Sequence, residues 1–198
     1  MQKLNKMGKS IKGTQTEQNL LKAFAGECQA KNRYEFFGEK AKKEGFEQIA
    51  AIFEKTALQE QSHAKQFFKF MEGGTVEIKS SFATGLSDQT INNLRTAINE
   101  ENNEWSALYP QFSETAKAEG FPAIAAIFKL IARVEAEHEK RFKKLLKRLE
   151  DGTLFRSEQA TRWECRKCGF IHEGVQPPQI CPACNHPIGY FEEMADDL

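Results

Sequence analysis

The sequence lacks the features that would suit a protein to a membrane or a nucleic acid. No stretch approaches the roughly 20 consecutive apolar residues that a membrane-spanning helix requires. The basic residues 1–12 contain no apolar segment, so no signal peptide is expected. Lysine plus arginine and aspartate plus glutamate number 28 each, which leaves no net charge to attract a polyanion. We therefore expect a cytoplasmic protein that binds neither nucleic acid nor membrane.

Cysteine is nearly absent from the first 164 residues, where Cys28 stands alone and is expected to be a packing thiol. The other cysteines form two C-x-x-C pairs, a pattern that in a reducing compartment indicates a metal site rather than disulfides. They are Cys165, Cys168, Cys181 and Cys184. Four thiolates favour a tetrahedral ion, and the spacing alone admits zinc or a single iron. Four cysteines fill such a site, so His172 and His186 are expected at the surface.

At 198 residues, the chain has room for one ordinary domain and something small. Apolar residues at helical spacing predict four helices, at about 17–43, 46–71, 87–119 and 121–149. Thr14 and Glu17 form a candidate capping box for the first helix, and Ser87 is a candidate N-cap for the third. Pro110 predicts a kink or a re-registered turn inside the third helix. The connection 75–86 is long enough for the crossover of a ferritin-like bundle.

An internal repeat relates the two halves of this helical region. Residues 41–53 match residues 116–128 at an offset of 116 − 41 = 75. The same offset relates Glu60 to Glu135, His63 to His138 and Tyr34 to Tyr109. Glu27 has no counterpart at position 102, and the nearest acids lie at positions 101 and 104. Glu27 precedes its tyrosine by seven residues, whereas Glu101 precedes Tyr109 by eight. One inserted residue predicts a π-bulge between about Glu101 and Tyr109.

Each half of the repeat supplies one central glutamate and one E-x-x-H pair, whose members share a helix face. The candidates are Glu27, Glu60 and His63 in the first half, and Glu101 or Glu104, Glu135 and His138 in the second. Solvated helix faces explain acids such as Glu39, Glu44, Glu72 and Glu139, but not acids within apolar stripes. Buried carboxylates need a cation, and mixed oxygen and nitrogen ligands favour iron or manganese. A di-iron helix bundle has this ligand pattern.

Tyr34 and Tyr109 share the 75-residue offset and lie near the candidate ligands along their helices. Core packing explains a buried tyrosine as well as a functional role does. Their repeat-related placement is equally compatible with hydrogen bonds to ligand carboxylates.

Together these motifs resemble those of rubrerythrins, from about residue 14 to residue 195. They are Glu27 with Arg33-Tyr34, Glu60-x-x-His63, Glu101-x-x-Glu104 with Tyr109-Pro110, Glu135-x-x-His138, Cys165-x-x-Cys168 and Cys181-Pro-x-Cys184. The resemblance implies an all-α, ferritin-like di-iron four-helix bundle at 1–152 and a linker at 153–162. A small β-rich, rubredoxin-like module would follow at 163–198. It also assigns both Glu101 and Glu104 as ligands and makes the tetrathiolate ion iron, with zinc as a possible substitute.

The resemblance further implies a peroxidase that reduces hydrogen peroxide to water at the di-iron centre. Electrons would come from NAD(P)H by way of a donor redox protein and the tetrathiolate iron. On oxidation, one iron would exchange His63 for Glu104, while His138 would stay bound. The protein would be a head-to-tail homodimer. The alternatives are a ferroxidase or iron-storage protein of the ferritin class, and a non-enzymatic zinc-ribbon module carried on a helical scaffold.

Overall fold

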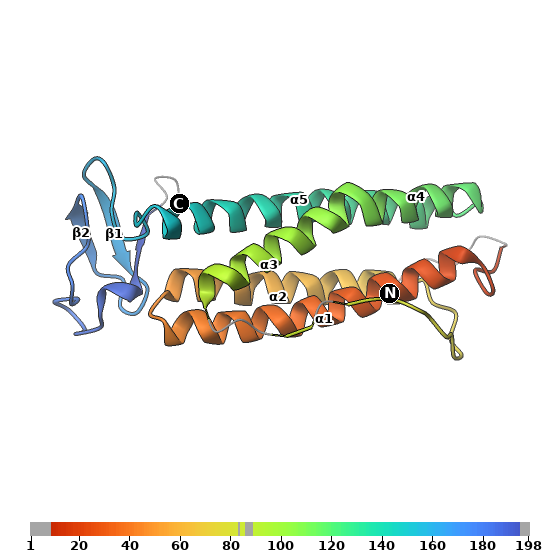
Figure 1. The fold of residues 1–198 in the computed structure, drawn as a ribbon, viewed down its shortest axis with the longest axis horizontal. Helices are drawn as coiled ribbons and strands as arrows, with labels where there is room; N and C mark the ends of the chain where they lie inside the picture. Colours follow the sequence, from red (N-terminus) through yellow and green to blue (C-terminus); the bar gives the residue numbers. More distant parts are fainter. Residues whose placement is uncertain (1–8, 83, 86–88, 195–198) are drawn as a thin grey trace.

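The computed structural model describes residues 9–82, 84–85 and 89–194. It contains an elongated helical bundle with a small β module at one end (Figure 1). The helices are α1 (Gln15–Lys43), α2 (Glu47–Phe68), α3 (Thr90–Asn103), α4 (Tyr109–Ala118) and α5 (Pro122–Glu150). A single π-helical segment, η1 (Glu104–Leu108), joins α3 to α4. The predicted fold class, a four-helix bundle followed by a β-rich module, is confirmed.

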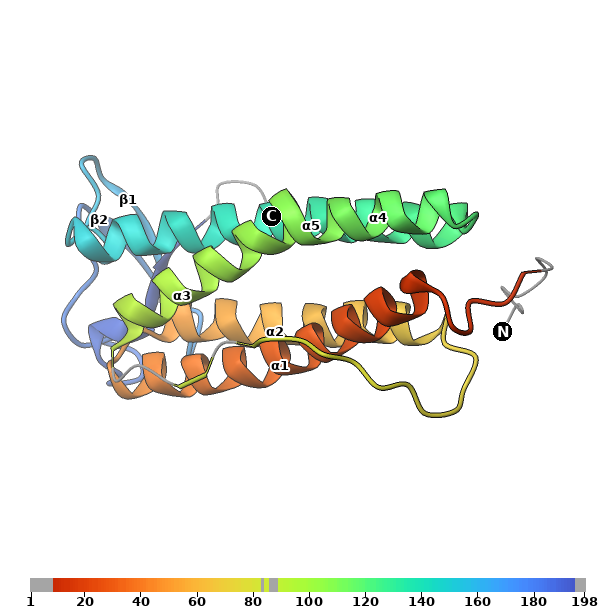
Figure 2. The same cartoon turned by 45° about the vertical axis from the view of Figure 1, so that its right-hand side comes forward.

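The helices pack as two hairpins. α1 lies along α2, and the α3–η1–α4 rod lies along α5. After α2 the described part of the connection runs back along α1, as both views show (Figures 1 and 2). This long crossover brings α3 to the opposite hairpin, as the residues 75–86 predicted. None of the described helices is long and apolar enough to cross a membrane.

The start of α1 is capped twice. The Thr14 hydroxyl accepts a hydrogen bond from the Glu17 amide, and the Glu17 carboxylate accepts one from Gly13 rather than from Thr14. The predicted capping box is therefore present, except that the Glu17 carboxylate bonds to the amide one residue before the N-cap. Glu119, which follows α4, accepts hydrogen bonds from the amides of Gln15 and Thr16. A carboxylate from one hairpin thus caps the first helix of the other.

The predicted π-bulge is confirmed as η1, where the Tyr109 amide bonds to the carbonyl of Glu104, five residues back. Pro110 follows at once, near the start of α4, where its missing N–H is tolerated. The second helix ends at Phe68, not at residue 71, because Phe70 and Met71 form bonds across three residues instead of four. Ser87 lies outside the described residues, and α3 begins at Thr90.

Two aromatic clusters fill the core, one on each side of the bundle's polar centre. Tyr34, Phe37, Phe53 and Phe142 form the first cluster; Tyr109, Phe112, Phe128 and Phe67 form the second. Each member corresponds to one in the other cluster at the 75-residue offset. Their ring separations agree: Phe53–Phe142 and Phe67–Phe128 are both 5.0 Å, and Phe37–Phe53 and Phe112–Phe128 are both 5.5 Å. The sequence repeat is therefore a repeat of packing.

The β module is a three-stranded antiparallel sheet in the order β2-β1-β3. Its strands are β1 (Thr161–Cys165), β2 (Ile171–Gly174) and β3 (Phe191–Glu193). Buried Trp163 and Phe191 form its core. The module contacts the bundle closely: Arg148 of α5 pairs with Glu193 at 3.0 Å, and the backbone of Gly189 lies against that of Gly45.

Candidate metal centres

Two histidines and four glutamates converge inside the bundle. Glu60 and Glu135 each direct one carboxylate oxygen to each histidine. His63 Nδ1 lies 2.9 Å from Glu60 Oε2 and 2.9 Å from Glu135 Oε1. His138 Nδ1 lies 3.0 Å from Glu60 Oε1 and 2.8 Å from Glu135 Oε2. Both glutamates are therefore placed to bridge two ions, each with its own histidine.

Each half of this constellation is completed by one further glutamate. Glu27 Oε2 lies 3.8 Å from His63 Nδ1, and Glu101 Oε2 lies 3.5 Å from His138 Nδ1. The result is two overlapping four-residue groups whose ligand atoms lie within 4.8 Å of one another. Glu60 and Glu135 belong to both groups. The local reason is the E-x-x-H spacing, which stacks carboxylate and imidazole on the inner faces of α2 and α5.

The terminal glutamates are oriented by the two repeat-related tyrosines. Tyr34 donates a hydrogen bond of 2.6 Å to Glu101 Oε1, and Tyr109 donates one of 2.6 Å to Glu27 Oε1. Each tyrosine thus serves a glutamate on the opposite hairpin. Because the outer oxygen of each carboxylate is engaged, the other oxygen is left facing the histidines.

The inward-facing atoms show that this cluster fits metal ions. Several buried atoms have no hydrogen-bond partner: Glu27 Oε2, Glu60 Oε1, Glu101 Oε2, both oxygens of Glu135, and His138 Nδ1. Leaving so many charged groups unsatisfied in the interior would be very costly. All of them lie at positions where cations between the side chains would satisfy them. Oxygen and imidazole donors in this ratio suit iron or manganese.

The pKa values of the clustered side chains also indicate a site for cations. Burial, with the nearby charges of Glu135 and Glu60, raises the pKa of Glu27 well above its usual range. Burial and Glu60 likewise raise the pKa of Glu101 to about 8. Burial opposes a charged imidazole at His138, yet the surrounding carboxylates outweigh it and raise the pKa of His138 to about 12. The cluster carries more negative charge than its own residues balance, so it favours cations.

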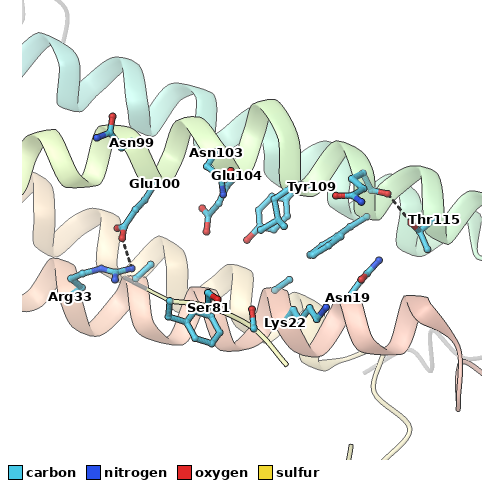
Figure 3. Close-up of a pocket in the computed structure, with 18 of the residues that line it drawn as sticks. Asn19, Lys22, Arg33, Ser81, Asn99, Glu100, Asn103, Glu104, Tyr109 and Thr115 are labelled. Atoms are coloured by element: carbon cyan, nitrogen blue, oxygen red, sulfur yellow. Dashed lines mark hydrogen bonds and ion pairs between the residues drawn. The ribbon is translucent and has the colours of Figure 1, made fainter. Parts of the chain in front are cut away.

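Glu104 lies apart from both four-residue groups. Its partly exposed side chain borders a cavity of about 690 Å³ between α1 and the α3–η1–α4 rod, with residues 80–82 of the crossover on the outer side. Figure 3 shows the carboxylate of Glu104 and the hydroxyl of Tyr109 directed toward the middle of this cavity. At one end, Arg33 and Glu100 form an ion pair of 3.0 Å.

Two supporting residues were not predicted from the sequence, and the expectation that Glu139 lies on a solvated face is wrong, because its side chain is buried. Gln59 Oε1 lies 3.1 Å from His138 Nε2 and fixes the ring from behind. Glu139, the residue after His138, accepts hydrogen bonds from Trp105 Nε1 and Asn102 Nδ2, both at 3.0 Å. Trp105 lies in η1, so this carboxylate ties the π-helical turn to α5. In the sequence, the one feature that points to Gln59 and Glu139 is that each lies next to an E-x-x-H motif.

The four cysteines of the tail form a second candidate site. Their sulfur atoms lie within 4.8 Å of one another, with Cys165–Cys184 and Cys168–Cys181 both at 3.7 Å. Metal–sulfur bonds of about 2.3 Å in a tetrahedron give sulfur separations of about 3.8 Å. Backbone amides also point at the sulfurs, including that of Ala183 toward Cys181. Cys28 belongs to neither of these groups and is partly buried.

Comparison with known proteins gives consistent matches along the whole chain. The family model described as Rubrerythrin matches residues 18–146 and 92–166, and the model described as Rubrerythrin, rubredoxin-like domain, matches residues 163–192. The chain is 54% identical over 194 residues to the rubrerythrin of Porphyromonas gingivalis, covering 98% of this chain and 97% of that protein. It is 50% identical over 184 residues to the rubrerythrin of Nitratidesulfovibrio vulgaris, covering 93% and 96%. A solved structure of nigerythrin in a mixed-valence state superposes with a TM-score of 0.61 at 28% identity, covering 93% of this chain and 92% of that one.

Proposed function

This chain belongs to the rubrerythrin family of di-iron proteins with a rubredoxin-like domain, and on that basis we propose that it reduces hydrogen peroxide to water. The observation that supports this most directly is the sharing of Glu60 and Glu135 between the two histidines. Glu60 and Glu135 would hold two ions side by side, and such a pair would supply the chemistry that acts on the two oxygens of one peroxide. We place this peroxidase in the cytoplasm, in defence against oxidative stress.

We propose a ligand assignment that the geometry of the cluster supports. Glu60 and Glu135 would bridge the ions, Glu27 and His63 would complete one centre, and Glu101 and His138 the other. When bound, the iron pair supplies the two electrons that cleave the peroxide bond. The chain's own residues fix the ions, orient the carboxylates through Tyr34 and Tyr109, and leave an open approach beside Glu104. Two protons and two electrons convert one hydrogen peroxide into two water molecules.

We assign the electron delivery to an iron held by Cys165, Cys168, Cys181 and Cys184. A donor redox protein, itself reduced by NAD(P)H, would supply electrons one at a time. Within one chain the route is long: Glu47, next to the module, precedes Glu60 by 13 residues of α2, or about 20 Å at 1.5 Å per residue. A head-to-tail homodimer would shorten it by placing each tetrathiolate iron near the partner's carboxylate cluster.

We also assign an exchange of ligands to His63 and Glu104. His138 is fully buried and held from behind by Gln59, whereas the His63 side chain is 11% exposed. Glu104 faces the adjacent cavity and belongs to neither of the four-residue groups. Ferric iron favours an anionic oxygen over a neutral imidazole, so oxidation would draw Glu104 inward and release His63.

Replacement of one exposed ligand sulfur tests this function. Cys168→Ser should reduce steady-state peroxide turnover with an external donor at least tenfold, because the tetrathiolate iron is lost or altered. Oxidation of the prereduced protein by one addition of peroxide should persist. Cys28→Ser is the matched control, since Cys28 lies outside both sites. Unchanged turnover in Cys168→Ser would show that the tetrathiolate site is not the point of electron entry. A ferroxidase of the ferritin class would instead oxidise added ferrous iron without any need for that site.

A further inference from the structure

The cavity beside Glu104 is far larger than hydrogen peroxide needs. Hydrogen peroxide fills about the space of two water molecules, or roughly 60 Å³ at about 30 Å³ per water. The cavity measures about 690 Å³, within the range of pockets that bind organic molecules. It adjoins the carboxylate cluster directly, because Tyr34, Tyr109 and Glu104 all line it. Any molecule bound there lies next to the candidate reaction centre.

Its charged lining is balanced. The lining contains two basic residues, Lys22 and Arg33, and two acidic residues, Glu100 and Glu104. Arg33 and Glu100 already neutralise each other in their ion pair. Such a lining gives no net preference for an anion or a cation, so it suits an uncharged ligand.

The rest of the lining divides by chemistry. Asn103 and Gln111 provide amide groups that can bond to a hydroperoxide or alcohol group. Ala23, Phe82 and Phe112 provide apolar and aromatic surface for an organic substituent. A site for hydrogen peroxide alone would have no use for that apolar surface.

We propose that this cavity binds organic hydroperoxides, so that the protein reduces peroxides carrying an organic group as well as hydrogen peroxide. The inference rests on the proposed peroxidase function. The O–O bond of ROOH breaks, and two electrons and two protons yield ROH and water. The electrons come from the same donor protein through the tetrathiolate iron, and the protons come from solvent, which reaches the open cavity.

Cumene hydroperoxide tests the substrate class. With iron-loaded protein and an external donor, kcat/KM for cumene hydroperoxide should fall within about tenfold of the value for hydrogen peroxide. Turnover of hydrogen peroxide without turnover of cumene hydroperoxide would overturn this inference and leave the peroxidase function standing. Turnover of neither would instead reject the peroxidase function.

A cavity-filling substitution tests the location. The nearest atom to a Cβ built on Gly26 is Glu104 Oε1, at 3.9 Å, so a Cβ fits there, and a longer side chain would extend into the cavity beside Glu104. Gly26→Leu should lower kcat/KM for cumene hydroperoxide at least tenfold relative to that for hydrogen peroxide. Ala25→Leu adds the same side chain at the neighbouring position of α1, outside the cavity lining, and should leave this ratio unchanged. An unchanged ratio in Gly26→Leu would remove the cavity from the proposal.

Binding of the alcohol product gives a readout that does not depend on turnover. In calorimetric titration of the oxidised full-length protein, 2-phenyl-2-propanol should bind with measurable heat. Gly26→Leu should weaken that binding at least tenfold, and Ala25→Leu should leave it unchanged. Absence of binding to the unsubstituted protein, or equal binding to Gly26→Leu, would contradict the proposal.

Discussion

At the scale of single residues, the two tyrosine hydroxyls prepare the terminal carboxylates for metal. Tyr109→Phe removes the donor to Glu27 Oε1, a fully buried carboxylate, and keeps the ring in its aromatic cluster. Loss of such a supporting hydrogen bond typically weakens metal binding about 10–100-fold. We expect that loss at the His63 centre, measured by competition with a chelator.

The chain offers matched comparisons for this substitution. Tyr34→Phe should weaken the other centre, because Tyr34 bonds to Glu101. Tyr190→Phe removes a hydroxyl in the β module and should leave metal binding in the bundle unchanged. Equal affinity in Tyr109→Phe and the unsubstituted protein would show that the hydroxyl does not support the ligand.

The two histidines differ in their surroundings. If His63 alone exchanges with Glu104, substitution of each histidine should have a different effect on iron binding and on peroxide reduction. His63→Ala should retain both irons in the oxidised protein but slow peroxide reduction at least tenfold, because the ligand of the reduced state is gone. His138→Ala should lose iron, because a fully buried ligand with no substitute is removed. Metal analysis and stopped-flow oxidation measure the two effects. Equal iron loss in both variants would contradict the exchange.

Helical spacing was sufficient to predict which of these residues share the bundle interior. It could not predict which glutamates reach both histidines, because that depends on distances between helices. Glu60 and Glu27 both come from the first half of the repeat, yet only Glu60 reaches both histidines. Nor could spacing identify Gln59, whose contact with His138 lies 79 positions away in sequence.

At the scale of elements, the π-helical turn η1 is the feature that breaks the symmetry of the repeat. The sequence predicted this turn, because the glutamate-to-tyrosine spacing is one residue longer in the second half of the repeat than in the first. A single inserted residue in a continuing helix must be absorbed locally. The sequence did not predict how η1 is held in place, because that depends on the contact with Glu139 of α5. Helical spacing also extended the second helix to residue 71, whereas α2 ends at Phe68.

The anchor of η1 can be tested with Glu139→Gln. A glutamine has one acceptor oxygen, whereas Trp105 Nε1 and Asn102 Nδ2 bond to the two separate oxygens of Glu139. One donor would lose its acceptor, at a cost of about 1–3 kcal/mol in the free energy of unfolding. Urea unfolding measures this cost, and amide hydrogen exchange should quicken in η1.

Glu137→Gln is the control for that substitution, because Glu137 lies on the same helix with a side chain 68% exposed. Its ion pair with Lys140 is a surface contact that contributes little. Similar unfolding energies and exchange rates in the two variants would show that Glu139 does not hold the turn.

At the scale of the whole molecule, the module is fastened to its own bundle. Arg148 of α5 donates hydrogen bonds to the carbonyls of Thr153 and Leu154 and pairs with Glu193 of β3. Close backbone contact between Gly189 and Gly45 adds a second point of attachment. The resemblance predicted the module but not this contact, because the repeat that contains Gly45 gives no sign of a partner for it. A fastened module cannot swing toward the carboxylates of its own chain, which is consistent with electron delivery between subunits.

The fastening depends on the absence of a side chain at Gly189. A Cβ at this position would overlap the carbonyl oxygen of Gly45, and backbone cannot move aside as a flexible side chain can. Gly189→Ala should therefore release the module while both metal sites stay loaded. Gly174→Ala is the comparison, because a Cβ there meets first the tip of the His172 ring, which can rotate. Nuclear magnetic relaxation of residues in β1 should report faster tumbling in Gly189→Ala alone; slow tumbling matched to the bundle in both variants would show that the contact does not fix the module.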